Sequence, residues 1–374
     1  MTRAATRLAV GPANYAGQAY RWAVAAERHL AVPATSFTFD PTPPGRRGRA
    51  DFRFAVHQPV RAHRFTTRRG RAARLEQVLG PATHVALDGF LPLTGADLGA
   101  DLRRLGGRGQ RLALIAHGTD VRDPDAHRER YPFSYYADAD PEWVAEARRR
   151  AARNRALAAE SGLPVFVSTP DLLSYLPSAT WLPVTVDPRQ WSTPRPAFAG
   201  GPPVVLHRPS RSRPPIKGTQ VIDPILREMA ARGLIRYLAP ERVPHDAMPA
   251  LVARADVVVD QILGGYYGVA AVEGLAAGRL VVGYVCPATR AAMPEEPPVV
   301  DAPAQAFVEV MARIVADPGS FAQQAAAGPA FVRRWHDGTA AAEALAAFCG
   351  VGDGARGTAD DAERETAINR DMPL

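Results

Sequence analysis

The stretch Ala255–Gly283, ADVVVDQILGGYYGVAAVEGLAAGRLVVG, contains the pattern that decides the fold of this 374-residue chain. A short apolar run leads through a glycine-rich turn into a helical pattern from Val269 to Ala277, and a second apolar run follows from Leu280. Apolar runs that alternate with helical segments predict strand–helix–strand units of a parallel sheet. The same alternation continues in both directions along the chain.

Before this stretch, the pattern predicts strands and helices that alternate in the same way. The expected strands of the first half are Arg7–Gly11, Thr35–Phe39, Phe52–His57, His84–Asp88, Arg111–Ala116 and Pro164–Ser168. The expected helices between them are Gly17–His29, Arg71–Leu79, Ala96–Leu105 and Pro141–Ser161. The second half repeats the alternation with strands at Val204–His207, Leu234–Leu238, Asp256–Gln261, Leu280–Val285 and Val299–Val300. Its expected helices are Gly218–Arg232, Asp246–Arg254, Val269–Ala277, Ala304–Ala316 and Ala330–Phe348.

The predicted fold class is therefore α/β, with two Rossmann-like, doubly wound parallel-sheet domains that face a central cleft. The first domain is expected at residues 1–187 and the second at 204–329, joined by a proline-rich linker at 188–203. Residues 330–350 are expected to form a helix that packs back toward the first domain. Residues 351–374 are polar and rich in Gly and Asp, which predicts a disordered tail.

The composition of the chain argues against several classes of protein and of site. No apolar run approaches the ~20 residues of a membrane-spanning helix, and the first residues lack a signal-peptide pattern, so a cytoplasmic location is expected. Cys286 and Cys349 are too few for a disulfide framework or a zinc site. The net charge of +7 is uneven, because residues 1–200 contain 28 basic and 18 acidic residues. Such a basic half attracts anions: nucleic acid, anionic lipid or a phosphorylated substrate.

Lys217 is the only lysine of the chain, although Lys and Arg together number 45. A compact ammonium and a planar guanidinium are not equivalent in a tight phosphate site, which draws attention to this position. Arg208 follows an expected strand nearby, and Lys217-Gly218 opens an expected helix. The structural alternative is that both are solvated surface cations.

The glycine-rich turn Gly264–Gly268 opens the helix that begins at Val269, and Glu273 lies about one turn into that helix. Free N–H groups and the positive end of the helix dipole suit a phosphate. A carboxylate suits paired sugar hydroxyls instead. Together these residues predict a nucleotide-sugar site, with cations on the diphosphate and Glu273 on the ribose.

These residues resemble a motif of the GT-B, family-4-like retaining glycosyltransferases (glycosyltransferase group 1). That family has Gly-Arg, Lys-Gly and then Glu-Gly-Phe-Gly-Leu-x-x-x-Glu-Ala. This chain has His207-Arg208, Lys217-Gly218 and Gly265-Tyr266-Tyr267-Gly268-Val269-Ala270-Ala271-Val272-Glu273. The resemblance implies that Arg208 and Lys217 are catalytic and neutralise the leaving diphosphate. It also implies a donor-binding set made of Glu273, Gly268, Tyr267, Tyr266, Gly265 and Val269.

In the first half, the loop Gly11–Gln18 resembles the family's glycine-rich loop, and His117–Asp120 resembles its segment beside the reacting sugar. The resemblance implies that His117 is catalytic, and that Asn14 and Gly17 lie near the donor. Gly11 and Asp120 are expected on the acceptor side. The structural alternatives are a plain strand–helix turn and a structural histidine at a strand end.

One position departs from the family pattern. The first Glu of the family motif, which faces the hexose, is Gly265 here. Tyr266, Tyr267, Asp260 and Gln261 are the candidates to take over its contact. The departure also keeps open a catalytically inactive nucleotide-sugar-binding homologue.

The expected function is a retaining hexosyl transfer from a nucleotide-diphospho-sugar to a glycan, lipid-linked or small-molecule acceptor. No Asp-x-Asp motif occurs near the site, so neither a divalent metal nor another cofactor is expected. The alternatives are a sugar-nucleotide epimerase of the same fold and a nucleic-acid binder that uses the arginines of residues 1–75. No nucleic-acid-binding motif supports the latter, so nucleic acid is not an expected partner. Transient contact with the inner face of the plasma membrane is a further expectation.

Overall fold

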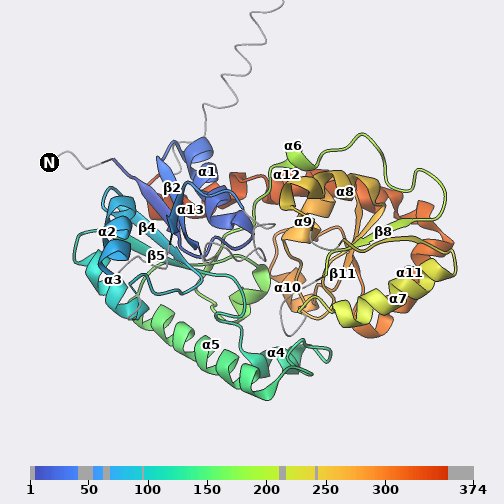
Figure 1. Ribbon diagram of the computed structural model, residues 1–374, viewed down its shortest axis with the longest axis horizontal. Helices are drawn as coiled ribbons and strands as arrows, with labels where there is room; N and C mark the ends of the chain where they lie inside the picture. Colours follow the sequence, from blue (N-terminus) through green and yellow to red (C-terminus); the bar gives the residue numbers. More distant parts are fainter. Residues whose placement is uncertain are drawn as a thin grey trace, which may run out of the picture.

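The computed structural model describes residues 5–40, 54–61, 68–94, 97–209, 216–240 and 243–352. The chain forms two α/β domains that lie side by side (Figure 1). Each domain contains one sheet in which all strands are parallel. The prediction of two parallel-sheet domains is confirmed.

The first sheet has seven strands in the order β3-β2-β1-β4-β5-β6-β7. Their bounds are β1 Leu8–Gly11, β2 Ala34–Asp40, β3 Gln58–Arg61, β4 His84–Asp88, β5 Arg111–Ala116, β6 Val165–Val167 and β7 Thr180–Trp181. The direction of winding reverses between β1 and β4, which are adjacent and pair through Leu8 to Gly11. Ligands of such sheets bind beyond the carboxyl ends of the strands at this reversal.

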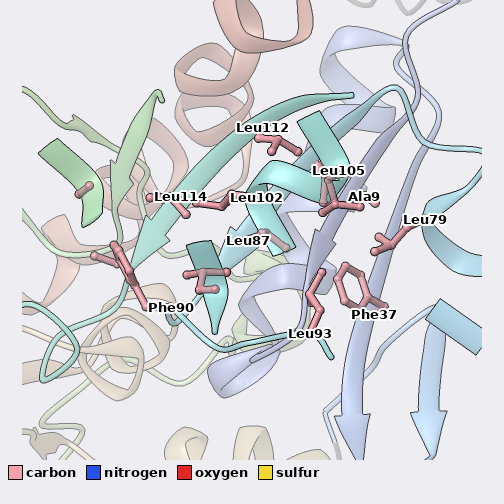
Figure 2. Packing of buried hydrophobic residues seen from close by; sticks show 14 of the residues in the cluster. Ala9, Phe37, Leu79, Leu87, Phe90, Leu93, Leu102, Leu105, Leu112 and Leu114 are labelled. Atoms are coloured by element: carbon pink, nitrogen blue, oxygen red, sulfur yellow. The ribbon is translucent and has the colours of Figure 1, made fainter. Parts of the chain in front are cut away.

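The helices of the first domain cover both faces of its sheet. They are η1 Tyr15–Gly17, α1 Gln18–Leu30, α2 Arg68–Leu79, α3 Leu98–Gly106, α4 Pro124–Arg130, α5 Pro141–Ser161 and η3 Pro170–Ser174. Figure 2 shows how leucines of α3, such as Leu102 and Leu105, meet Leu112 and Leu114 of β5 in the core. Strand residues that are apolar on both faces are expected where helices cover both faces of a parallel sheet.

The second sheet has five strands in the order β12-β11-β10-β8-β9. They are β8 Val204–His207, β9 Arg236–Leu238, β10 Val257–Val259, β11 Leu280–Gly283 and β12 Val299–Asp301. The helices of this half are α6 Pro188–Trp191, α7 Thr219–Ala231, η4 His245–Ala247, α8 Met248–Arg254, α9 Val269–Ala276, α10 Pro287–Ala291, η5 Ala304–Ala306, α11 Phe307–Ala316, η6 Pro318–Phe321 and α12 Ala322–Trp335. Here the winding reverses between β8 and β10.

The last helix, α13 (Thr339–Cys349), packs on α1 of the first domain, whereas α12 packs on α9 of the second (Figure 1). The expected single helix Ala330–Phe348 is therefore wrong. The chain breaks between α12 and α13, where the buried His336 bonds to the carbonyl of Val184 at 2.7 Å and Gly338 adopts a φ of 112°. This break returns the chain to the first domain.

The expected strand Phe52–His57 is also displaced. Of the described part, residues 54–57 are irregular and β3 begins at Gln58. The side chains of Ser36 and His57 bond to each other's backbone N–H at 3.0 and 3.1 Å. These two bonds take the place of backbone pairing between Ser36 and His57, so the regular pairing of β2 with β3 starts at Gln58. Apart from Val351 and Gly352, the predicted disordered tail lies outside the described residues.

Candidate functional site at the interdomain cleft

The winding reversals of both sheets open onto one cleft between the domains. Its volume is about 720 Å³, which lies in the usual range for small-molecule sites. Loops that follow β1, β4 and β5 line one wall, and loops that follow β8 and β10 line the other. The fold therefore brings the carboxyl ends of strands from both sheets to a single place.

Lys217 reaches this cleft because the next residue is glycine. Gly218 has a φ of +82°, and a Cβ there would lie 2.7 Å from the side chain of Ile262. That close approach lets the carbonyl of Lys217 accept a hydrogen bond from Ile262 N at 3.1 Å. The lysine is thus fixed beside the loop that follows β10.

The Lys217 ammonium meets a carboxylate that the family motif did not indicate. Its Nζ donates to Asp260 Oδ1 at 3.0 Å, and Gly268 N donates to Asp260 Oδ2 at 2.9 Å. Asp260 therefore ties the lysine to the start of α9. An ammonium has three donors, so two remain for another acceptor. Val269 and Ala270, which form the start of α9, line the same cleft.

Glu273, on α9, is almost completely buried and has both oxygens engaged. Arg208 Nη1 contacts Oε2 at 3.4 Å, and His245 Nε2 lies 3.1 Å from Oε1. A carboxylate offers about four lone-pair sites, so hydroxyl groups can still bond to it. The ring of His245 also packs edge-to-face against Phe54 of the first domain, with ring centroids 4.8 Å apart.

At Gly265, a tyrosine of the first domain lies where a side chain would be. A Cβ built at this position would lie 2.2 Å from the ring of Tyr131, and φ is +72°. The Tyr131 hydroxyl contacts Cys286 Sγ at 3.0 Å, and Cys286 N bonds to the carbonyl of Gly265 at 3.1 Å. The space of the family's hexose-facing Glu is thus filled by a buried aromatic ring.

This tyrosine belongs to a larger contact between α4, with the loop that follows it, and the glycine-rich turn. His127 Nε2 lies 3.2 Å from the carbonyl of Gly264, and Tyr135 N bonds to the carbonyl of Leu263 at 3.3 Å. Burial lowers the pKa of His127 to about 3, so the imidazole is neutral at pH 7. Segments more than a hundred residues apart in sequence therefore form an interdomain contact behind the cleft surface.

Arg122 lines the cleft itself. Its guanidinium is 4.2 Å from the ring centroid of Tyr266 and bonds to Asp171 Oδ2 at 2.7 Å. Burial is the largest influence on the pKa of Arg122 and lowers it, but Asp171 and the neighbouring tyrosines Tyr135, Tyr266 and Tyr136 together raise that pKa above its usual value. Arg122 therefore remains charged, and its guanidinium packs over the ring of Tyr266 at the cleft surface.

On the wall of the first domain, Asp88 at the end of β4 organises the loop that follows β1. Its two oxygens accept hydrogen bonds from Ala13 N and Asn14 N at 2.6 and 2.9 Å. His117 Nε2 lies 3.2 Å from the same carboxylate. Asp120 accepts from the backbone N–H groups of His117 and Gly118. Buried carboxylates therefore fix both loops beside the cleft.

The structure brings eight of the predicted site residues to the cleft. They are Arg208, Lys217, His117, Asp120, Glu273, Gly268, Val269 and Tyr266. Of the candidates for the missing hexose contact, Asp260 and Gln261 line it as well.

The other predicted residues lie behind the cleft surface. Asn14 turns its amide to the carbonyl of Ala55, and Tyr267 bonds to His336 at 3.0 Å. A Cβ at Gly11 would meet the carbonyl of Phe37 at 2.2 Å, which explains that glycine structurally. Gly17 is buried against Phe54, and Gly265 against Tyr131. These positions support the cleft without lining it.

The sequence analysis did not select several residues that line the cleft or contact its lining residues. Asp88 ends an expected strand, so its place at a carboxyl strand end was a usable signal. His245 follows a loop without a pattern, and Trp143 and Arg150 lie on an arginine-rich helix where nothing in the sequence selects one face. In the described ranges, no three His, Cys, Asp or Glu side chains gather as a metal site, and no helix is long and apolar enough to cross a membrane.

The fold is similar to that of solved glycosyltransferases. Sucrose-phosphate synthase from Thermosynechococcus elongatus matches with a TM-score of 0.61 and 14% identity, over 92% of this chain and 98% of that chain. HepE from Anabaena, in complex with UDP and glucose, matches with a TM-score of 0.58 and 13% identity, over 92% and 99%. A glycosyltransferase from Rickettsia africae matches with a TM-score of 0.54 and 12% identity, over 93% and 98%. No protein-family model and no curated protein sequence matches the chain. At these identities the likeness shows the fold, and the predicted GT-B fold is confirmed.

Proposed function

We propose that this protein is a glycosyltransferase that moves a hexosyl unit from a nucleotide-diphospho-sugar to an acceptor with retention of the anomeric configuration. One observation supports this most strongly. Arg208, Lys217 and the first turn of α9 meet in one interdomain cleft, with Glu273 one turn further along α9. The similar HepE structures contain UDP, UDP-glucose, or UDP with glucose.

The site residues have distinct roles in this proposal. Lys217 and Arg208 bind the diphosphate together with the N–H groups of the first turn of α9, and Glu273 accepts hydrogen bonds from the ribose. In the reaction, the bond between the sugar C1 and the diphosphate oxygen breaks while the acceptor oxygen bonds to C1. The acceptor proton passes to the departing diphosphate. Cations that are already in place stabilise the charge on the leaving group without reorganisation.

His117 is proposed to orient the transferred sugar. The carboxylate of Asp88 fixes its ring from one side, and Tyr15 packs edge-on against it with ring centroids 5.0 Å apart. Closure of the two domains around the donor would exclude bulk water and limit hydrolysis of the donor. No metal ion or other cofactor is proposed.

The test is turnover of UDP-glucose, and of other nucleotide sugars, by the wild-type protein and by Lys217→Ala. Removal of one preorganised charge at a leaving group typically costs about 10²–10³ in rate, and that loss is expected here. Lys217→Arg keeps the positive charge but replaces the compact ammonium with a planar guanidinium, so we expect turnover between that of Lys217→Ala and that of the wild type. Arg189→Ala removes a cation whose side chain is 81% exposed and is expected to be neutral.

Two results would contradict the proposal. Full turnover by Lys217→Ala would exclude its role on the diphosphate. A wild-type protein that binds UDP but never cleaves a nucleotide sugar would instead be an inactive binding homologue. Proton NMR of the product determines the anomeric configuration, and an inverted product would exclude retention.

A further inference from the structure

The positively charged side chains of the cleft differ in whether a carboxylate contacts them. Three of them have a carboxylate within 4 Å: Arg122 with Asp171, Arg208 with Glu273, and Lys217 with Asp260. Arg150 also lines the cleft, but in the described parts of the chain it makes one hydrogen bond, from Nε to the carbonyl of Thr119 at 3.2 Å. Across the described parts of the chain, no carboxylate lies within 4 Å of its guanidinium and no acceptor bonds to Nη1 or Nη2. Arg150 therefore presents to the cleft a guanidinium that no carboxylate of the described residues contacts directly.

The sequence of α5 fixes this orientation. Asp140 caps the helix by accepting from Trp143 N at 2.9 Å, and Gly162 ends it in a left-handed conformation. One face is buried in the domain through residues such as Ala147 and Ala151. Trp143 and Arg150 are seven residues apart, about two helical turns, so they share one edge of the helix about 10 Å apart. Both line the cleft.

The neighbouring arginines of α5 are used differently. Arg148 forms two hydrogen bonds with the Asp125 carboxylate, at 2.6 and 2.7 Å, and Arg149 pairs with Glu146 at 2.9 Å. The nearby carboxylate of Asp120 accepts backbone N–H groups, so it does not neutralise Arg150 by direct contact. Arg150 is thus distinguished from Arg148 and Arg149 by its lack of a carboxylate partner, and from the exposed Arg153 by its direction toward the cleft.

Arg150 lies on the wall of the first domain, whereas Arg208 and Lys217 lie on the wall of the second. A guanidinium whose two terminal NH2 groups remain available suits bidentate binding of phosphate or carboxylate. Trp143 is half-buried, and its ring packs on Tyr136 with centroids 5.4 Å apart, which leaves a rigid aromatic surface in the cleft. Aromatic faces bury large apolar area and suit the C–H face of a sugar ring.

We propose that Arg150 binds an anionic group of the acceptor, a phosphate or a carboxylate on a sugar or polyol, and that Trp143 packs on the acceptor ring. This inference rests on the proposed glycosyl transfer, and it specifies the acceptor class. The donor diphosphate occupies the opposite wall, so the two anions bind to different cations. The positive charge of the first half of the chain favours the approach of such an acceptor.

The experiment titrates inorganic phosphate, and separately acetate, into the full-length protein saturated with UDP, by isothermal titration calorimetry. UDP fills the donor cations, so the added anion reports a second site. We expect Arg150→Gln to weaken binding of the preferred anion at least tenfold. Arg153→Gln is the matched control, because Arg153 is an exposed arginine of the same helix, and it should bind like the wild type. Thermal melts check that both variants are folded.

The preferred anion identifies the group: a phosphate ester if phosphate binds more tightly, and a carboxylate if acetate does. The inference is overturned if neither anion binds to the UDP-saturated wild type, or if Arg150→Gln binds as tightly as the wild type. An equal loss in Arg153→Gln would also overturn it, because the effect would then be general charge. Failure of UDP itself to bind would contradict the proposed function instead, so the two failures are distinguishable.

Discussion

Replacing Gly265 with alanine tests how the interdomain contact is built. A Cβ at this position would lie 2.2 Å from the Tyr131 ring, and the backbone has a φ of +72°. The left-handed conformation costs an L-residue ~1–2 kcal/mol, and insertion of atoms into a packed site adds about 1–3 kcal/mol. The free energy of unfolding should therefore fall by about 2–5 kcal/mol.

The two contributions separate in a double-mutant cycle. In a Tyr131→Ala background the ring is absent, so Gly265→Ala should cost only the backbone strain of ~1–2 kcal/mol. The coupling between the two substitutions is then about 1–3 kcal/mol, large enough to measure. Gly233→Ala is the matched control, because Gly233 has a φ of +71° in the same domain and no atom within 4 Å of its Cβ position.

The assay is urea unfolding followed by tryptophan fluorescence for the wild type, both single variants, the double variant and the control. Gly233→Ala should show the strain alone. An equal cost of Gly265→Ala with and without Tyr131 would refute the reasoning, because the ring would then not occupy the space of the missing side chain.

Three further predictions concern the same region. Asp260→Asn removes the carboxylate between Lys217 and Gly268 N, so it should lower the free energy of unfolding by about 1–3 kcal/mol and tighten UDP binding by calorimetry; weaker binding would contradict this. Burial lowers the pKa of His127 to about 3 and of His207 and His336 to about 4. Below pH 6.5 these histidines take up protons in the unfolded chain but stay neutral in the folded protein. The free energy of unfolding should therefore fall by ~2 kcal/mol per histidine between pH 6.5 and 5. A free energy of urea unfolding that is unchanged over that window would argue against this. Tyr267→Phe loses the bond to His336 and should cost ~1–2 kcal/mol, with unchanged UDP affinity because Tyr267 lies behind the cleft.

The fold was largely predictable because its strands are short apolar runs. The bounds of β4, β5, β8 and α5 match the expected ones, since each run is bordered by polar or turn-forming residues. The helix α4 was missed because Pro124–Arg130 is short and nearly all polar. Its cap, Asp123, accepts from Asp125 N and Ala126 N at 2.9 and 3.2 Å, so it is held by local bonds without an apolar stripe.

The site was predictable where strand ends and glycine turns mark it. Lys217, Gly268 and Glu273 follow from such signals. Asp260 was a candidate for a sugar contact, but its pairing with Lys217 was not expected. The meeting of Tyr131 with Gly265 could not, because it joins an unpatterned loop of one domain to a turn of the other. Arg150 could not be selected from its arginine neighbours either, since its direction depends on which face of α5 is buried.

The most direct test of the central claim is a crystal structure of the protein with UDP bound. We predict diphosphate density between Lys217 Nζ and the N–H groups at the start of α9, with the ribose hydroxyls on Glu273. Diphosphate density outside the interdomain cleft, or a ribose that does not reach Glu273, would contradict the assignment of this cleft as a nucleotide-sugar site.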